Sequence, residues 1–353
     1  MKILYISRHF NKGGYYILEH LIRQGFDIAG IVLRDEYSPF KDPWRRPWAI
    51  ARYHAECAYY RCQPCKFLHS EELSAKRSRV PILLVDDINS DAACARIEAL
   101  SPDVALIGGG WHQRIAPRVF NLPPYGTLNV HPSLLPAFRG TTVHRWQILH
   151  GVTESGVSIH YVEEDFDTGA VVGQTRLRVG IDDTPQVLAD KAGRAAVPLV
   201  HDILGRIRDL AKGGRLDGMV QSPMNEPAFR AWKWDDALLE IDWRRPLRDV
   251  YNLIRAAHQE SYKYKGPIMR IRGKPFLVRR ARLAAAADAP AGEWPRVTRI
   301  GRDGVWIARS GDGDALILTQ VQPGGPDHAR QRAFPACRLA AQGLVAVGDR
   351  LGE

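Results

Sequence analysis

Two polar side chains stand two residues apart in the stretch NVHPSLLPAFRG, which begins at Asn129. Side chains at positions i and i+2 of a strand point to the same face, so Asn129 and His131 are expected to lie together. Pro132 lacks an N–H and ends the strand's ladder, which places both at the carboxyl end, where open α/β sheets bind ligands. An amide and an imidazole there are suited to stabilising an oxyanion and handling a proton. A histidine on its own is more often a hydrogen-bonded core residue.

A group of carboxylates follows in the turn EEDFDTG, residues 163–169. Such a turn is usually solvated, but a buried Asp167 would hold an imidazolium charged and orient it. Asn129, His131 and Asp167 then form a set suited to acyl transfer. The sequence has no GxSxG motif, and no cysteine stands near this set. We therefore expect the nucleophile to come from the substrate, and an amine fits that role.

A glycine run, GGG, lies in the stretch LIGGGWHQRI at 106–115, directly after a buried apolar segment. Three glycines let a flat ligand approach the backbone closely, although a tight turn explains the run equally well. The run matches neither the GxGxxG dinucleotide fingerprint nor a P-loop.

Two metal sites are the alternatives to metal-free chemistry, since imidazole, thiolate and carboxylate are zinc ligands. A metal-dependent hydrolase would draw on His131, His144, His160 and Asp167. A zinc site elsewhere would draw on Cys57, Cys62, Cys65 and His69. The other interpretation of these cysteines is a helical insert in which they are incidental, because no second CxxC pair follows.

The candidate catalytic side chains require a sheet whose strands end at the site. The order of the apolar segments predicts such a sheet. A strand, a helix ending at Gly25 and a second strand open the chain as a βαβ unit, which indicates a parallel sheet. Strands are expected at 2–7, 27–33, 80–85, 104–108 and 126–131, and an antiparallel pair at 156–162 and 169–179. Helices are expected from Asn89 or Ser90 to Leu100, at about 142–150, and from Pro185 to about Arg208. The predicted fold is α/β, with a Rossmann-like, mostly parallel sheet.

The composition changes at two places and suggests two domains. Residues 34–79 are rich in Trp, Tyr, Arg and Cys, and predict a helical insert or lid within a catalytic domain at 1–210. Residues 211–230 are loose in composition and indicate a linker. The short strands and glycine turns of 231–353 are typical of a smaller C-terminal β-barrel, OB-like in type.

Charge and compartment limit the class of partner. The formal net charge of +10 over 353 residues favours an anionic partner such as nucleic acid, a nucleotide or a polyglutamate tail, although an arginine-rich surface accounts for it too. No segment approaches the length of a membrane span, and the start MKILYISRHF lacks the pattern of a signal peptide. We expect a cytoplasmic protein with no membrane or DNA partner.

Taken together, NVHPSLLPAFRG, ESGVSIHYVEEDFDTG and GGGWHQRI resemble the folate-dependent formyltransferase family over about residues 1–210. The resemblance implies 10-formyltetrahydrofolate as formyl donor, an amine as acceptor, no metal, and Asn129, His131 and Asp167 as catalytic residues. It implies donor binding, mainly through backbone groups, by Gly109, Gly110, Trp111, Gln113, Ile115, Val162, Glu163 and Asp165.

The segments DALLEIDWRRPLRDVYNLIRAA, GKPFLVRRARL and GVWIARSGDGDALILTQVQPGG resemble the C-terminal barrel of methionyl-tRNA formyltransferases. Two stretches depart from that subfamily. Thr141-Thr-Val-His144 replaces Ala-Ala-Pro-Ile, and the first turn at 8–14 lacks Gly-Thr-Pro. We therefore expect a small-molecule amine acceptor, either a nucleotide-linked amino sugar or an ornithine- or peptide-type amine, with methionyl-tRNA as the alternative. Acceptor contacts are assigned to Asn11, Lys12, Gly13, Gly14, Ser133, Arg139 and His144, the first four as an anion site at a helix N-terminus.

Overall fold

The computed structural model describes residues 1–8, 11–34, 71–221, 230–231, 234–258, 266–286, 292, 294–324 and 332–351. Contacts among Cα atoms divide the chain into two compact units. The first unit comprises 1–143, 154–179 and 187–232, and the second comprises 144–153, 180–186 and 233–353. No helix in the described ranges is long and apolar enough to cross a membrane.

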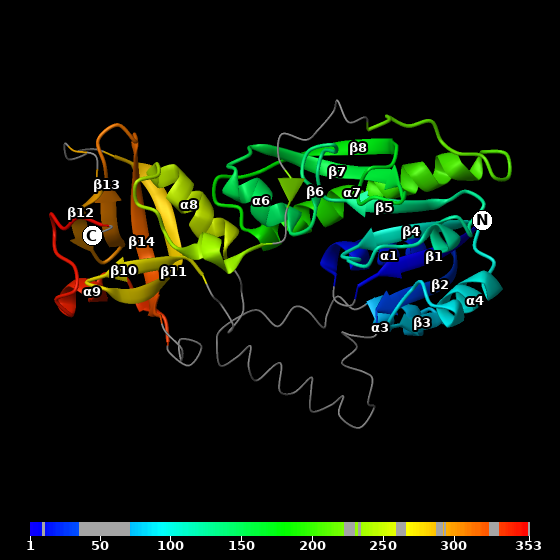
Figure 1. Ribbon diagram of the computed structural model, residues 1–353, viewed down its shortest axis with the longest axis horizontal. Helices are drawn as coiled ribbons and strands as arrows, with labels where there is room; N and C mark the ends of the chain where they lie inside the picture. Colours follow the sequence, from blue (N-terminus) through cyan, green and yellow to red (C-terminus); the bar gives the residue numbers. More distant parts are fainter. Residues whose placement is uncertain are drawn as a thin grey trace, which may run out of the picture. The chain divides into compact units, whose positions relative to one another are not determined.

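The first unit is built on a seven-stranded sheet in the order β3-β2-β1-β4-β5-β7-β8 (Figure 1). The strands from β3 to β5 are parallel, whereas β7 is antiparallel to both β5 and β8. The strands are β1 Lys2–Ser7, β2 Asp27–Arg34, β3 Ile82–Val85, β4 Val104–Gly109, β5 Thr127–His131, β7 Glu154–Tyr161 and β8 Val171–Arg178. The helices are α1 Lys12–Arg23, α3 Glu71–Arg77, α4 Asp91–Ala99, α5 Pro117–Phe120 and α7 Pro185–Arg208. The strand order reverses beside β1, and ligands of open α/β sheets bind at such a point.

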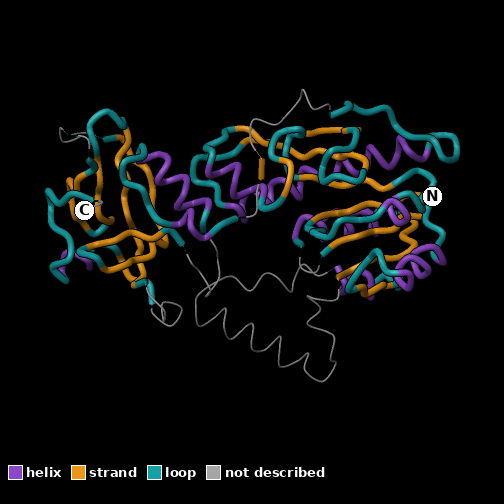
Figure 2. Tube along the Cα trace, viewed as in Figure 1, coloured by secondary structure: helices purple, strands orange, loops and turns teal. Residues whose placement is uncertain are grey.

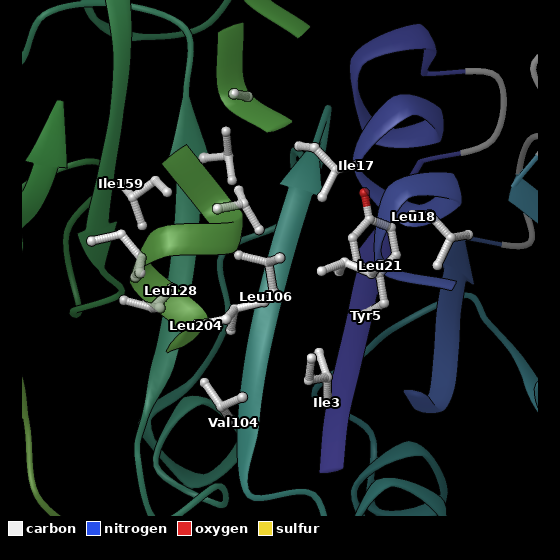
Figure 3. Packing of buried hydrophobic residues seen from close by; sticks show 14 of the residues in the cluster. Ile3, Tyr5, Ile17, Leu18, Leu21, Val104, Leu106, Leu128, Ile159 and Leu204 are labelled. Carbon is white, nitrogen blue, oxygen red and sulfur yellow. The ribbon is translucent and has the colours of Figure 1, made fainter. Parts of the chain in front are cut away.

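One face of this sheet packs on α1 and α7. Helix α1 starts at the N-cap Asn11, whose side chain accepts from Gly14 N, and its apolar residues Ile17, Leu18 and Leu21 are fully buried. They pack in one cluster with Tyr5 of β1, and Figure 3 shows the four side chains together. The opposite face buries a second cluster, in which Ile97 of α4 and Val119 of α5 take part. Both faces of the parallel strands are thus covered, which explains their uninterrupted apolar sequence.

The second unit is built on an antiparallel six-stranded sheet in the order β10-β11-β14-β13-β12, with β15 paired to β14. Figure 2 shows these strands in orange beside the turns of α8. The strands are β10 Ile268–Ile271, β11 Lys274–Ala285, β12 Arg296–Gly301, β13 Gly304–Ala308, β14 Asp314–Pro323 and β15 Phe334–Pro335. The helices are α6 Val143–Leu149, η3 Asp236–Leu239, α8 Leu247–Ala256 and α9 Arg338–Ala341. The sheet and α8 share one apolar core, which includes Val250, Ile254 and Leu316.

The predicted fold class is confirmed: a mostly parallel Rossmann-like sheet precedes a smaller antiparallel β unit. Two composition-based expectations meet a different local structure. Of the predicted insert, residues 35–70 lie outside the described ranges, whereas Glu71–Arg77 forms α3, which packs on α1 as part of the first unit. Of the predicted linker, residues 211–221 bond into the first unit, where Met219 pairs with Val171.

Candidate active site

Asn129 and His131 lie at the carboxyl end of β5, as their spacing predicts. The antiparallel partner β7 places His160 opposite Asn129 and Ser158 opposite His131. Both histidines are almost fully buried, with 4% and 2% of their side chains exposed. The ends of β5 and β7 therefore bring together four polar side chains, of which His131, Ser158 and His160 are buried and Asn129 is half-buried, and each buried one needs a partner there.

The loop after β5 turns back over His131. The peptide Leu135–Pro136 is cis, and Phe138 has a left-handed backbone with φ 58°. Ser133 is fully buried and donates to Ala137 O at 2.6 Å, which fastens the loop internally. The loop brings Phe138 O within 2.9 Å of His131 Nε2. Ser133 was assigned to acceptor binding from the sequence. In the structure its hydroxyl forms a hydrogen bond within the loop.

Asp167 enters the site from the turn between β7 and β8. Its backbone is left-handed, with φ 58°, a conformation that Asp tolerates better than most residues. A Cβ on Gly169 would lie 2.0 Å from Tyr161 O, so only glycine fits that position of the turn. Gly140 N donates to Asp167 Oδ2 at 3.0 Å, which joins this turn to the loop after β5. The backbone of this turn therefore requires glycine at 169 and favours aspartate at 167.

The other oxygen of Asp167 is the meeting point of the polar cluster. Oδ1 lies 3.2 Å from Asn129 Nδ2, 3.4 Å from His131 Nδ1 and 3.4 Å from His160 Nε2. Burial lowers the pKa of His131, but attraction and hydrogen bonding to Asp167 outweigh it, so the pKa is raised above its ordinary value. Burial raises the pKa of Asp167, but the two histidines outweigh it and hold the pKa well below the ordinary range. Phe138 O and Asp167 Oδ1 are both acceptors, one at each ring nitrogen of His131, so the contacts and both pKa directions favour an imidazolium–carboxylate pair.

His160 is a member of this cluster that sequence reasoning did not assign to the acyl-transfer set. Its Nδ1 lies 2.7 Å from Tyr161 O, an acceptor, so Nδ1 carries a proton. Its Nε2 lies 3.0 Å from Asn129 Nδ2 and accepts from that amide when the ring is neutral. His160 thereby fixes which way the Asn129 amide points. Strand alternation in GVSIHYV indicates an inward-facing His160, but its pairing with Asn129 depends on the strand register.

The glycine run lies where β1 and β4 end side by side. A Cβ on Gly108 would lie 1.7 Å from the Tyr5 hydroxyl, and Gly110 has φ 71°, so both positions require glycine. Trp111 and Val162 pack against the apolar cluster that contains Ile115, so these three expected donor contacts are close together. The Trp111 indole N–H is buried and has no hydrogen-bond partner within the described part of the chain.

The more polar residues expected around the donor are engaged with the protein. Gln113 accepts from Ile88 N at 3.1 Å and also bonds Asp87. Asp165 forms an ion pair with Arg114 on the surface, and Glu163 is exposed. Gly109, with φ 146°, ends β4.

The expected anion site at α1 already has internal partners. The Asn11 side chain accepts from Gly14 N at 2.8 Å, and Asn11 N donates to the fully buried Glu71 at 3.2 Å. Lys12 forms an ion pair with Asp190 at 2.5 Å, and Gly13 packs against Gly193. A carboxylate thus lies where an incoming anion would be expected, and the anion-binding role of 11–14 stays a prediction.

The remaining acceptor-side residues, Arg139 and His144, fall in different units. Arg139 lies in β6, Arg139–Gly140, which pairs with β9, Arg230–Ala231, and its guanidinium donates to Gln221 at 2.8 and 3.0 Å. His144 lies on α6, which belongs to the second unit.

No group of three or more His, Cys, Asp or Glu in the described ranges is arranged to hold a metal ion. The predicted zinc ligands Cys57, Cys62, Cys65 and His69 lie outside those ranges. Cys94 and Cys337 are free thiols.

Sequence comparison identifies the family to which this chain belongs. The family model "Formyl transferase" matches residues 82–202, and the model "Formyl transferase, C-terminal domain" matches 234–336. A methionyl-tRNA formyltransferase of Anaeromyxobacter dehalogenans (strain 2CP-1 / ATCC BAA-258) is 31% identical over 248 residues, which cover 70% of this chain and 76% of the relative. The chain belongs to the formyltransferase family. The prediction of a formyl-transferring enzyme is confirmed at this level.

Solved structures agree with this formyltransferase fold. The N-formyltransferase from Helicobacter canadensis, in complex with folinic acid and dTDP-3-aminofucose, superimposes with a TM-score of 0.60 at 16% identity, covering 90% of this chain and 99% of that one. HypX from Aquifex aeolicus, in complex with tetrahydrofolic acid, gives 0.56 at 16% identity, covering 100% of this chain and 51% of HypX. At these identities the likeness establishes the fold alone.

Proposed function

We propose that this formyltransferase moves the formyl group of 10-formyltetrahydrofolate directly to the amine nitrogen of a small-molecule acceptor. The observation that carries the proposal is the convergence of Asn129, His131 and His160 on one oxygen of Asp167. This arrangement keeps an imidazolium charged inside the protein, and it contains no side chain suited to attack a carbonyl. A neutral substrate nitrogen supplies the nucleophile, as family membership also favours.

In the proposed reaction, the acceptor nitrogen forms a bond to the formyl carbon, and the carbonyl π electrons move onto the formyl oxygen. The charged His131 and the Asn129 amide stabilise this oxyanion. Asp167 holds His131 charged and takes the proton released by the acceptor nitrogen, directly or through water. The intermediate then collapses and the bond from the formyl carbon to N10 breaks. Asp167 passes the proton it took, directly or through water, to N10, which leaves as tetrahydrofolate.

The resting hydrogen bonds are consistent with this exchange. Both Asn129 amide hydrogens have acceptors, His160 Nε2 at 3.0 Å and Asp167 Oδ1 at 3.2 Å. His131 lies 2.9 Å from Phe138 O but 3.4 Å from Asp167 Oδ1. Long contacts are the weaker ones, and catalytic hydrogen bonds often tighten only when substrate binds. We infer that the formyl oxygen takes the place of Asp167 Oδ1 as the acceptor of the Asn129 amide, while His131 keeps its contact with the carboxylate.

We place the donor along the glycine run and the apolar side chains beyond it. Gly109 and Gly110 leave the backbone open to a flat ring, while Trp111, Ile115 and Val162 supply apolar contacts. The buried, unpaired N–H of Trp111 is a donor that a bound ligand would satisfy. Gln113, Glu163 and Asp165 are assigned to the rim of this donor site.

The acceptor is the finer part of the proposal, and we favour a nucleotide-linked amino sugar or an ornithine- or peptide-type amine. The support is the departure of Thr141–His144 and of the first turn from the methionyl-tRNA pattern. Methionyl-tRNA is the second candidate, because the C-terminal family model matches and the net charge is +10. The predicted acceptor contacts at Arg139 and His144 apply to either class.

The test is a formylation assay with 10-formyltetrahydrofolate and three acceptors in parallel: a dTDP-linked amino sugar, ornithine and methionyl-tRNA. Mass spectrometry detects the formylated acceptor, and absorbance follows tetrahydrofolate release. We expect a small amine to be formylated and methionyl-tRNA to be left unchanged, with product reduced about 10²-fold or more for His131→Ala. Formylation of methionyl-tRNA alone would replace our acceptor by the second candidate.

A further inference from the structure

Gln221 is a buried residue outside every motif of the sequence. It follows α7 in the segment whose Met219 exchanges two backbone hydrogen bonds with Val171, at 2.8 and 2.9 Å. Only 9% of Gln221 is exposed, and its side chain lies between the Asp167 turn and the loop after β5. A buried amide needs all its partners nearby, so the contacts of Gln221 are informative.

Each end of the Gln221 amide bonds a different part of the site. Its Nε2 donates to Asp167 O at 3.1 Å and to Gly169 O at 2.7 Å. Its Oε1 accepts from Arg139 Nε at 3.0 Å and from Arg139 Nη2 at 2.8 Å. Both hydrogens and both lone pairs are thus used. The amide cannot be rotated by half a turn without placing oxygen against two carbonyls.

We propose that Gln221 is a positioning residue for formyl transfer, which holds the turn of Asp167 and the arginine beside Gly140 in the arrangement that lets Asp167 reach His131. This inference rests on the proposed function, because Gln221 is assigned no contact with substrate. It acts on the reaction only by holding Asp167 in place. Gly140 N, next to Arg139, donates to Asp167 Oδ2 at 3.0 Å. Gln221 therefore joins the two chain segments that fix the carboxylate.

The geometry explains why such a residue is needed. Asp167 has a left-handed backbone, with φ 58°, which is held by its surroundings rather than by its own preference. Its carboxylate meets His131 Nδ1 at 3.4 Å, already long for a hydrogen bond, so a small shift of the turn weakens the contact. The charged and titratable groups that face His131 are Asp167, Arg139 and His160. Gln221 bonds the first two of these residues directly.

The test is a histidine titration of the full chain by NMR, with ¹³C at Cε1, in the absence of substrates. The His131 resonance is identified as the one missing from His131→Gln. Gln221→Met keeps the size of the side chain but removes all four hydrogen bonds, and we expect it to lower the pKa of His131 by about one unit, a size typical of a weakened charge contact. Gln221→Asn, a milder change, keeps the amide but shortens its reach, and we expect a smaller fall.

Ile207→Val is the matched control. Ile207 of α7 is fully buried in the apolar core, so shortening its side chain destabilises the same unit without touching the hydrogen bonds of Gln221. We expect its His131 titration to match that of the unaltered chain. An unchanged His131 pKa in both Gln221 variants, or an equal fall in Ile207→Val, would overturn the inference. Because no acceptor is used, this outcome is independent of whether the formylation assay succeeds.

A kinetic readout separates positioning from binding once an acceptor is known. For Gln221→Met we expect kcat to fall about tenfold, with the KM for 10-formyltetrahydrofolate within about twofold, and the alkaline limb of the kcat profile to move to lower pH. A rise in KM with kcat unchanged would mean that Gln221 binds substrate, contrary to the inference.

Discussion

Replacing Asp167 by Asn tests the electrostatic core of the mechanism. At 3.4 Å, and with an effective dielectric constant of about 20, the attraction between His131 and Asp167 is about 5 kcal/mol. Burial opposes it, and without the carboxylate burial prevails. We therefore expect the pKa of His131 to fall below its ordinary 6.5 in Asp167→Asn, which leaves the ring neutral at pH 7.

The substitution also disturbs one hydrogen bond. If the new amide oxygen faces His131, its NH₂ group faces the Gly140 N–H that now donates to Oδ2 at 3.0 Å. An unpaired buried N–H costs about 1–3 kcal/mol, so the variant is also expected to be less stable.

The assay is kcat/KM for 10-formyltetrahydrofolate across pH, with unfolding measured in parallel. We expect Asp167→Asn and Asp167→Ala to lose about 10²-fold or more at pH 7, in the range seen when an oxyanion donor is removed, and His131→Ala to lose as much. The role given to Asp167 would be refuted by near-full activity of a folded Asp167→Ala, or by a His131 that still titrates above 6.5 in Asp167→Asn.

Three further outcomes follow from the contacts of the site. His160→Leu removes the acceptor of the Asn129 amide and is expected to lower kcat about tenfold, the equivalent of one hydrogen bond, whereas His160→Gln, whose oxygen still accepts, loses less in the same assay. Gly169→Ala places a methyl 2.0 Å from Tyr161 O and is expected to cost about 1–3 kcal/mol in thermal unfolding, while Gly205→Ala on α7, with open space around it, is neutral or stabilising. The pair of His131 and Asp167 should stabilise the fold most between pH 3.8 and 6.5. The contribution of Asp167 is lost as the pH falls through its lowered pKa, and that of His131 is lost as the pH rises through its raised pKa. Urea unfolding as a function of pH, compared with Asp167→Asn, checks this.

The fold and the candidate catalytic residues could be predicted from the sequence where neighbouring residues carry the information. Asn129 and His131 are two residues apart on one strand, so periodicity alone puts them on one face. Asp167 stands in a turn whose glycine and left-handed backbone belong to the same few residues. The βαβ order predicted the parallel sheet in the same way, because each element carries its own apolar pattern.

Other members of the site depend on contacts between distant segments, which no local pattern encodes. His160 meets Asn129 through the register of β5 with β7, and a shift by one residue would turn it to the opposite face. Gln221 lies in a stretch whose polar and glycine-rich composition is that of a linker, yet it is buried. Residues 71–77 were predicted as the end of an insert from the composition of 34–79, but they form a helix whose Glu71 and Glu72 are both buried.

The assignment of residues to the two units has a consequence for how the protein is made. Residues 144–153 and 180–186 belong to the second unit, although the chain around them belongs to the first. The partners of 180–186 come much later in the sequence: Tyr251 donates to Asp182 at 2.5 Å, and Arg255 donates to Gly180 O at 3.1 Å. In 144–153, Leu149 of α6 packs against the core of the second unit, which includes Val250 and Leu316. On the ribosome, both segments therefore emerge before their partners exist. We expect the first unit to acquire its sheet during translation, whereas these two segments acquire their native packing only after α8 has been synthesised.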